Sequence, residues 1–232
     1  MNDLFLLNNF KSILLVPNGF SFFKKETSGS ILEKNYPNTS VSFLPPFARD
    51  FFSLSNNEIE TVDVIFDLFP PILIPKEIYN EAIAYDALGS QFDLSVVGQL
   101  LSEEIQEYYA TYFINHNELN LFQKININPH FIHLSSLMFQ YLQTHYISKS
   151  DNTVSLFIHD SHADSILIKS QKINLINRFN FTSELDILYY LLNLIKQFGI
   201  KVDNCKIILF RNQNNKLSEL LIKYFPDLEF IG

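Results

Sequence analysis

The stretch Ser155–Lys169 reads SLFIHDSHADSILIK and decides how the C-terminal half of the chain folds. Two apolar runs flank a polar segment, and both runs are rich in the branched and aromatic residues that favour β-strands. A strand, a short polar turn and a returning strand therefore predict a β-hairpin. A third strand, KINLINRFNF (Lys172–Phe181), follows after a second polar turn and completes an antiparallel meander.

The rest of this half alternates helices and strands. FTSELDILYYLLNLIKQFGI begins with Ser183 and Asp186 at the spacing of a capping box and has Gly199 where a left-handed cap belongs. Its apolar residues cover most of its girth, which predicts a helix buried on more than one side. A short strand that begins near Cys205, an amphipathic helix that ends at Pro226, and a last strand follow. The predicted order is β-β-β-α-β-α-β.

The N-terminal half opens in the same way. SILLVPNGFSFFK (Ser12–Lys24) is again a strand, a tight turn and a returning strand, and a third strand and a helix follow. We therefore predict a duplicated α/β unit. The N-terminal domain spans residues 1–147 and carries inserted elements, and the C-terminal domain spans 148–232. The halves join near SKSDN (Ser148–Asn152), the most linker-like stretch.

The middle of the chain, from about residue 92 to residue 147, is less regular. SEEIQEYY predicts a helix with Glu103, Glu104 and Glu107 on a solvated face, although EYYATYFI also reads as a strand. PHFIHLSSLMFQYLQTHYI predicts a helix that starts after Pro129. These elements are expected to complete the N-terminal half.

Composition narrows the class of protein. The chain has 232 residues, of which 47% are hydrophobic and 18% charged, so a packed core is expected. The net charge of −8 argues against binding nucleic acid through a broad cationic face. A single cysteine excludes an intramolecular disulfide and a cysteine cluster for zinc. No stretch has the ~18 apolar residues of a membrane helix, and the N-terminus does not read as a secretory signal. We expect a cytoplasmic protein without direct membrane insertion.

Two tandem units that each open with a hairpin resemble the actin-like ATPase superfamily, which includes actin, sugar kinases, heat-shock chaperones and the bacterial proteins FtsA and PilM. The run Asn177–Ile200 more closely resembles an uncharacterised bacterial domain-of-unknown-function family within that superfamily. The shared pattern F…D-x-L-Y-Y-L-L is carried here by Phe181, Asp186, Leu188, Tyr189, Tyr190, Leu191 and Leu192. This resemblance implies two ribonuclease H-like units that form an actin-like fold.

The resemblance also implies where a nucleotide would bind. In active members, ATP and Mg²⁺ lie between the halves, an Asp-x-Gly turn from each half faces the phosphates, and a glycine-rich turn holds the adenosine. Glycine is needed in these turns because a Cβ blocks the approach of backbone N–H groups to phosphate oxygens. The matching phosphate-turn positions in this chain are Asn18, Gly19, Asp160, Ser161, His162 and Ser165.

All three nucleotide elements depart from the family pattern. The first turn lacks a carboxylate, His162 stands where the second turn has glycine, and RNQNNK, in the place of the adenosine turn, has no glycine. We therefore expect no catalytic residues and no ATP or Mg²⁺ as a cofactor. The favoured function is a non-catalytic scaffold or regulatory protein that contacts another protein, with Tyr108, Tyr109 and Tyr112 as exposed contacts. The alternative is a divergent ATPase or kinase that binds ATP in the interdomain cleft.

Three interpretations of HDSHAD (His159–Asp164) remain open: a metal site, a remnant phosphate turn, or a solvated hairpin tip. A metal would be shared by Asp160 and His162, with His159 or Asp164 as a further ligand. We favour the solvated tip and expect no metal site, because hairpin tips rarely surround a metal unaided. His130 and His133 are expected near the start of a helix, as a polar face or as core histidines whose hydrogen bonds are satisfied.

Overall fold

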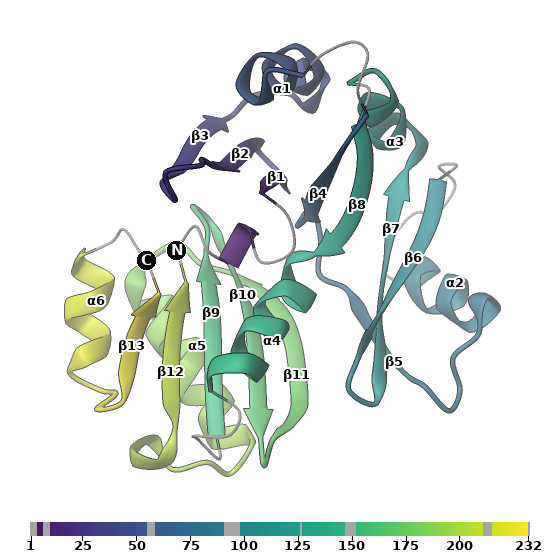
Figure 1. Ribbon diagram of the computed structural model, residues 1–232. Helices are drawn as coiled ribbons and strands as arrows, with labels where there is room; N and C mark the ends of the chain where they lie inside the picture. The colour runs from purple at the N-terminus through teal and green to yellow at the C-terminus, as the bar shows by residue number, and fades with distance from the viewer. Residues whose placement is uncertain are drawn as a thin grey trace. The chain divides into compact units, whose positions relative to one another are not determined.

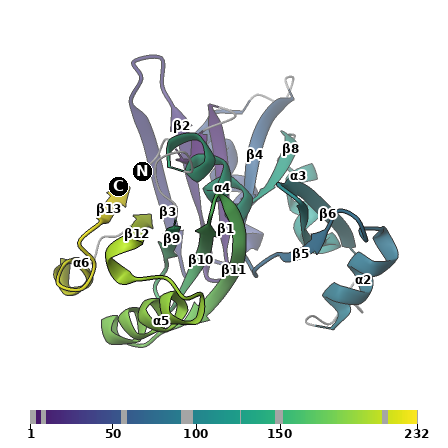
Figure 2. The same cartoon turned by 90° about the horizontal axis from the view of Figure 1, so that it is seen from below.

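The chain forms two compact units, Asn2–Leu137 and Met138–Gly232. The computed structural model describes residues 4–6, 10–54, 59–90, 98–125, 127–146, 152–210 and 215–231. Each unit is built on a five-stranded mixed sheet with helices against it (Figures 1 and 2). The boundary predicted at residues 147/148 falls outside the described residues.

The N-terminal unit contains the following elements: β1 (Lys11–Val16), β2 (Gly19–Lys25), β3 (Ile31–Pro37), α1 (Leu44–Phe52), β4 (Glu60–Phe66), β5 (Ile72–Pro75), α2 (Glu81–Gly89), β6 (Gly98–Ile105), β7 (Tyr108–Asn115), α3 (His116–Gln123) and β8 (Ile127–His133). Two single-turn 3₁₀ helices, Leu4–Leu6 and Val41–Phe43, precede β1 and α1.

Helix α4 (Leu134–His145) leads into the C-terminal unit. That unit contains β9 (Asn152–Ile158), β10 (His162–Lys169), β11 (Lys172–Asn180), α5 (Glu184–Gln197), a 3₁₀ turn (Val202–Asn204), β12 (Lys206–Phe210), α6 (Asn215–Ile222) and β13 (Leu228–Ile231). The predicted order β-β-β-α-β-α-β is confirmed.

The two five-stranded sheets have the same topology. The strand order is β3-β2-β1-β4-β8 in the N-terminal unit and β11-β10-β9-β12-β13 in the C-terminal unit. In each, the first three strands pair antiparallel and the last two join in parallel. The predicted duplication of an α/β unit is therefore confirmed at the level of topology.

One face of the C-terminal sheet packs against α5 and α6. Ile187, Leu191 and Leu194 of α5 are buried with β-strand residues such as Leu156 and Leu209 in one apolar core. The predicted capping box is present: the Ser183 side chain accepts from the Asp186 N–H, and the Asp186 side chain accepts from the Ser183 N–H. Gly199 has the predicted left-handed conformation, with φ of +64°.

The predictions for α5 and α4 need correction. Leu185 on α5 is 65% exposed, so this helix is not buried around most of its girth, as its apolar sequence suggested. The run from Pro129 is not all helix, because Ile127–His133 forms strand β8 and α4 begins only at Leu134. Pairing with β4 overrides the local preference of this segment. In α4, the ring of Tyr141 packs edge-on against Phe210 of β12, with centroids 5.5 Å apart.

The core of the N-terminal unit is rich in aromatic rings. Phe22 on β2 contacts Tyr36 on β3 and both Phe51 and Phe52 at the end of α1, with ring centroids 5.4–5.5 Å apart. Ile13 and Val64 of the sheet lie in the same buried cluster. Helix α1 is thereby held to the face of the sheet.

A three-stranded antiparallel sheet, ordered β5-β7-β6, is inserted between β4 and α3 together with α2. The helix predicted for SEEIQEYY is wrong: Gly98–Ile105 and Tyr108–Asn115 form a hairpin, and Gln106 in its turn has a φ of +49°. The alternative strand for EYYATYFI is confirmed. Tyr112 is fully buried and Tyr108 and Tyr109 are half-buried, so these tyrosines are not the exposed contacts that the sequence suggested.

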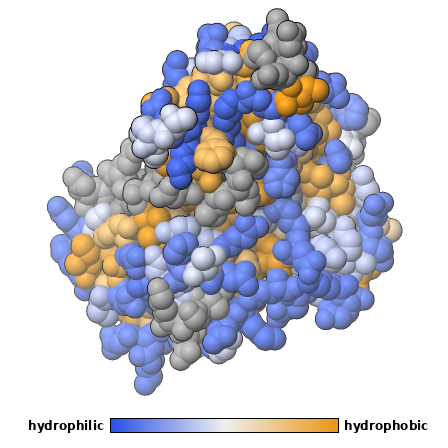
Figure 3. All heavy atoms as spheres, in the orientation of Figure 1, coloured by the Kyte–Doolittle hydropathy of each residue, from blue (hydrophilic) through white to orange (hydrophobic). Residues whose placement is uncertain are grey.

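The surface is mainly hydrophilic on the face drawn in Figure 3, and its apolar residues form separate patches. Around α6 and β13, Ile222, Tyr224 and Phe230 are 59%, 48% and 40% exposed. Among the described helices, none is both long and apolar enough to span a bilayer.

Candidate functional site

The β9–β10 hairpin brings the residues of HDSHAD together at its tip. The backbone N–H of His159 donates to the His162 carbonyl oxygen at 2.9 Å, which closes the turn. Asp160 and Ser161 lie exposed at the turn itself. His162 is the first residue of β10, and Asp164 lies two residues further, on the same face of the strand.

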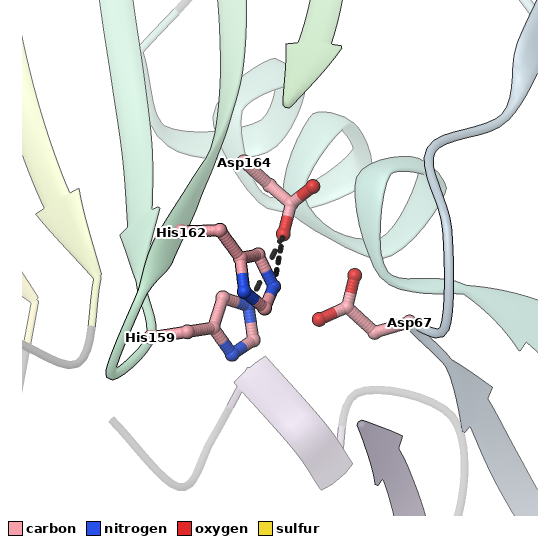
Figure 4. A group of neighbouring side chains, drawn as sticks. All are labelled: Asp67, His159, His162 and Asp164. Carbon is pink, nitrogen blue, oxygen red and sulfur yellow. Dashed lines mark hydrogen bonds and ion pairs between the residues drawn. The ribbon is translucent and has the colours of Figure 1, made fainter. Parts of the chain in front are cut away.

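Three side chains converge beside this turn (Figure 4). The imidazoles of His159 and His162 stack with centroids 4.1 Å apart and an interplanar angle of 15°. Oδ2 of Asp164 lies 3.1 Å from His159 Nε2 and 3.9 Å from His162 Nε2. The fourth residue drawn, Asp67, belongs to the N-terminal unit, where its backbone N–H donates to the Leu15 carbonyl oxygen.

Arg178 on β11 anchors the carboxylate of Asp164. Its Nε donates to Oδ1 at 2.8 Å and its Nη2 donates to Oδ2 at 3.0 Å, which makes a bidentate pair across the strands. Burial alone would raise the pKa of Asp164, but the hydrogen bonds from His159 and Arg178 outweigh burial and hold the pKa below its usual range. Asp164 is therefore ionised at neutral pH.

The pKa of His162 differs from that of an exposed histidine. Burial, together with the nearby His159 and Arg178, lowers the pKa of His162 to about 4. Its imidazole is therefore neutral at neutral pH. Its Nε2 is buried and has no hydrogen-bond partner among the described residues.

Ser165, the hydroxyl proposed to face a phosphate, is engaged within the unit. Its Oγ donates to the Asn177 carbonyl oxygen at 3.0 Å and lies 3.0 Å from the hydroxyl of Tyr190 on α5. Tyr190 in turn stacks on Phe179 with centroids 3.5 Å apart. The local packing thus gives Ser165 a role in joining α5 to the sheet.

The first predicted turn has its own structural explanation. Asn18 is exposed, and its carbonyl oxygen accepts from the Asn38 N–H. Gly19 has a φ of +145°, and a Cβ at this position would lie 2.3 Å from the Tyr36 carbonyl oxygen. The close approach of β3 therefore requires glycine here, independently of any ligand. Arg211–Asn214, most of the candidate adenosine turn RNQNNK, lie outside the described residues.

A second polar cluster lies in the N-terminal unit, where sequence reasoning expected a solvated helix. Oε1 of Glu103 accepts from the Tyr112 hydroxyl at 2.5 Å and from the His133 backbone N–H at 2.7 Å. Burial raises the pKa of Glu103 above its ordinary value, although these hydrogen bonds act against the rise. Glu104 is exposed and pairs with Lys76.

The two neighbouring histidines are structural. Nδ1 of His133 accepts from the Ser135 N–H at 3.0 Å, so its other nitrogen, 2.8 Å from the Phe69 carbonyl oxygen, must carry the proton and donate. Both ring nitrogens are therefore used, as expected for a satisfied core histidine. His130 lies 2.8 Å from Asp63 across the parallel strands β8 and β4, on a strand and not at the start of a helix.

Solved structures share this fold over nearly the whole chain. A Bacteroides thetaiotaomicron protein with an actin-like ATPase fold and unknown function matches with a TM-score of 0.78 and 17% identity, over 95% of this chain and 90% of that chain. A chain of the PilM–PilN type IV pilus biogenesis complex matches with a TM-score of 0.67 and 12% identity, over 96% and 88%. The predicted actin-like ATPase fold is confirmed.

Sequence comparison gives the family. None of the curated proteins is significantly similar to the chain. A family model described as "Protein of unknown function (DUF3822)" matches residues 12–228, nearly the entire length. The resemblance to a domain-of-unknown-function family with an actin-like fold is thus confirmed, and the chain belongs to the DUF3822 family.

Proposed function

We propose that the protein is a non-catalytic actin-like protein that acts as a scaffold or regulator through contact with another protein. This proposal rests on one observation: a histidine side chain occupies the second hairpin turn. His162 occupies the position where active superfamily members have glycine, and its ring stacks on His159. A phosphate needs bare backbone N–H groups, and a stacked imidazole pair does not supply them.

Other contacts at the candidate phosphate turns support the same conclusion. The Ser165 hydroxyl is committed to Asn177 and Tyr190, and Gly19 is accounted for by Tyr36. A shared fold by itself does not fix function, so the proposal rests on these residues and not on the fold.

Exposed apolar residues supply candidate contact surfaces. Leu185 and Tyr189 lie one helical turn apart on α5 and are 65% and 73% exposed. Large apolar side chains placed together at a surface commonly mark protein contacts. PilM, whose structure is known in complex with PilN, gives a precedent for protein binding by this fold. We propose a protein partner of this kind, no nucleic-acid ligand, and a cytoplasmic location.

Thermal unfolding with ATP and Mg²⁺ tests the proposal against the divergent-enzyme alternative. A ligand at about 100 times its Kd stabilises a folded protein by about 2.7 kcal/mol, which raises the melting temperature by several degrees. We expect no change at millimolar ATP and Mg²⁺. A rise that Asp160→Ala abolishes would show that the second hairpin turn takes part in ATP binding, because Asp160 is exposed and its loss should not otherwise affect stability. The non-catalytic proposal would then lose the observation on which it rests.

A further inference from the structure

The side chains beside the β9–β10 turn have the composition of a metal site. His159, His162 and Asp164 each offer one ligand atom, and these atoms all lie within 4.8 Å of one another. Zinc holds its ligands at about 2.0–2.2 Å, so neighbouring ligand atoms in a tetrahedral site lie roughly 3.3–3.5 Å apart. The separations of 3.1 Å and 3.9 Å from Asp164 Oδ2 to the two Nε2 atoms bracket this value.

His162 gives an independent indication of a ligand. It is only 9% exposed, and its Nε2 has no hydrogen-bond partner among the described residues. A buried polar atom without a partner is destabilising, so such atoms are uncommon unless an ion or a water satisfies them. This nitrogen lies on the side of the ring that approaches Asp164 Oδ2.

Arg178 holds the proposed third ligand in place. It donates to both oxygens of Asp164, which fixes the plane of the carboxylate. An ionised carboxylate has about four lone-pair sites, so Oδ2 can accept from Arg178 and still coordinate a cation. Hydrogen-bonded partners of this kind typically orient metal ligands.

The ligand types select the class of metal. Imidazole favours zinc and related transition metals, whereas magnesium prefers an all-oxygen shell with several waters. We propose that His159, His162 and Asp164 bind one Zn²⁺ ion at the tip of the β9–β10 hairpin, with the remaining coordination position open to water or another ligand. The ligand set differs from the pair Asp160 and His162 suggested by the sequence, since Asp160 is exposed.

Competition between the full-length protein and a chromophoric zinc chelator tests this site. We expect the wild-type chain to bind one Zn²⁺ in preference to the chelator. The affinity of His162→Phe should fall by more than the roughly 10–100-fold that loss of an outer-shell partner costs, because a ligand itself is removed. Phenylalanine keeps an aromatic ring that can stack on His159 and has no nitrogen that could bind a metal, so the variant should unfold at a temperature close to that of the wild type. His162→Gln also removes the imidazole and replaces this variant if His162→Phe yields no folded protein.

The matched control is His145→Gln, which changes an exposed histidine on α4 and should bind Zn²⁺ like the wild type. Co²⁺ provides a second readout, because tetrahedral Co²⁺ absorbs visible light much more strongly than the hydrated ion, and the His162 variant should lose this absorption. The proposal is overturned if the wild type does not compete with the chelator, if the His162 variants bind Zn²⁺ as tightly, or if excess Mg²⁺ displaces the ion.

Discussion

The carboxylate of Glu103 is partly buried and accepts hydrogen bonds from two donors. Burial raises the pKa of Glu103 in the folded protein, so the folded state binds its proton more tightly than the unfolded state does. The stabilisation by this group is complete below the unfolded pKa of about 4.3 and is lost as the pH rises through the higher folded pKa.

We expect Glu103→Gln to gain stability relative to the wild type as the pH rises from about 4 to 7, because only the wild type then carries a charge at this position. Glutamine keeps the oxygen that accepts from Tyr112 and His133, and it removes the cost of a partly buried charge. Urea denaturation at several pH values measures the difference.

Glu103→Ala is the informative control, because it leaves both donors unsatisfied and should cost about 2–4 kcal/mol at every pH. If Glu103→Gln were instead destabilising by that amount at pH 7, the charge itself would be needed and the structural interpretation would be wrong.

A substitution at Gly19 tests whether the fold itself, and not a bound ligand, requires glycine at this position. A Cβ here would meet the Tyr36 carbonyl oxygen at 2.3 Å, so we expect Gly19→Ala to destabilise the protein by about 2–4 kcal/mol even without a ligand. Gly29→Ala is the matched control: Gly29 also has positive φ, but its Cβ would meet nothing within 4 Å, so backbone strain of about 1–2 kcal/mol is the whole cost. Equal losses in the two variants would contradict the role assigned to Tyr36.

The position of Arg178 shows what residue patterns could not predict. The turn at Ser170 and Gln171 pairs Lys169 with Lys172, and counting back from this pair places Asn177 opposite Asp164. A one-residue register shift between Leu167 and Ile168 brings Arg178 there instead. Sequence alone identified HDSHAD as the segment of interest, but neither the bulge nor the resulting ion pair has a local signal.

At the level of elements, α5 presents two faces with different roles. Ile187 and Leu191 are buried in the core, whereas Leu185 and Tyr189 are exposed. We expect the double variant Leu185→Ser and Tyr189→Ser to change the free energy of unfolding by less than about 1 kcal/mol, and Leu191→Ala to cost about 2–5 kcal/mol.

The same double variant tests the proposed contact surface. Cross-linking in cells that express the protein, followed by mass spectrometry, should recover fewer partner cross-links from the double variant than from the wild type. An unchanged set of partners would remove α5 as the contact surface, and a large loss of stability would show that these side chains belong to the core.

Elements were predictable where their apolar pattern agreed with their tertiary setting. The C-terminal half met this condition, with its capping box at Ser183, its glycine cap and its three-stranded meander. The β6–β7 hairpin did not, because Glu103 points toward Tyr112 and His133 and so breaks the alternation that marks a strand. A partly buried carboxylate with tertiary partners looks the same in sequence as a carboxylate on a solvated helix.

At the scale of the whole molecule, the repeated topology has a thermodynamic consequence. The strand order of the C-terminal sheet equals that of the N-terminal sheet, and its apolar core of Leu156, Leu191, Leu209 and similar residues is formed within the unit. A unit with its own core can in principle fold alone. Helix α4 covers part of the sheet through Tyr141 and Phe210, so an independent fragment must include this helix.

We therefore expect a fragment that starts at Leu134, the first residue of α4, and runs to residue 232 to unfold cooperatively in urea. Its m-value, the slope of the unfolding free energy against urea concentration, scales with the surface exposed on unfolding. It should be roughly half that of the full chain if the two units of the full chain unfold together. A matched fragment that starts at residue 152 lacks α4, leaves Phe210 uncovered and should be less stable or unfolded. If the longer fragment shows no cooperative transition, the C-terminal unit depends on the rest of the chain, and the duplication is one of topology but not of folding.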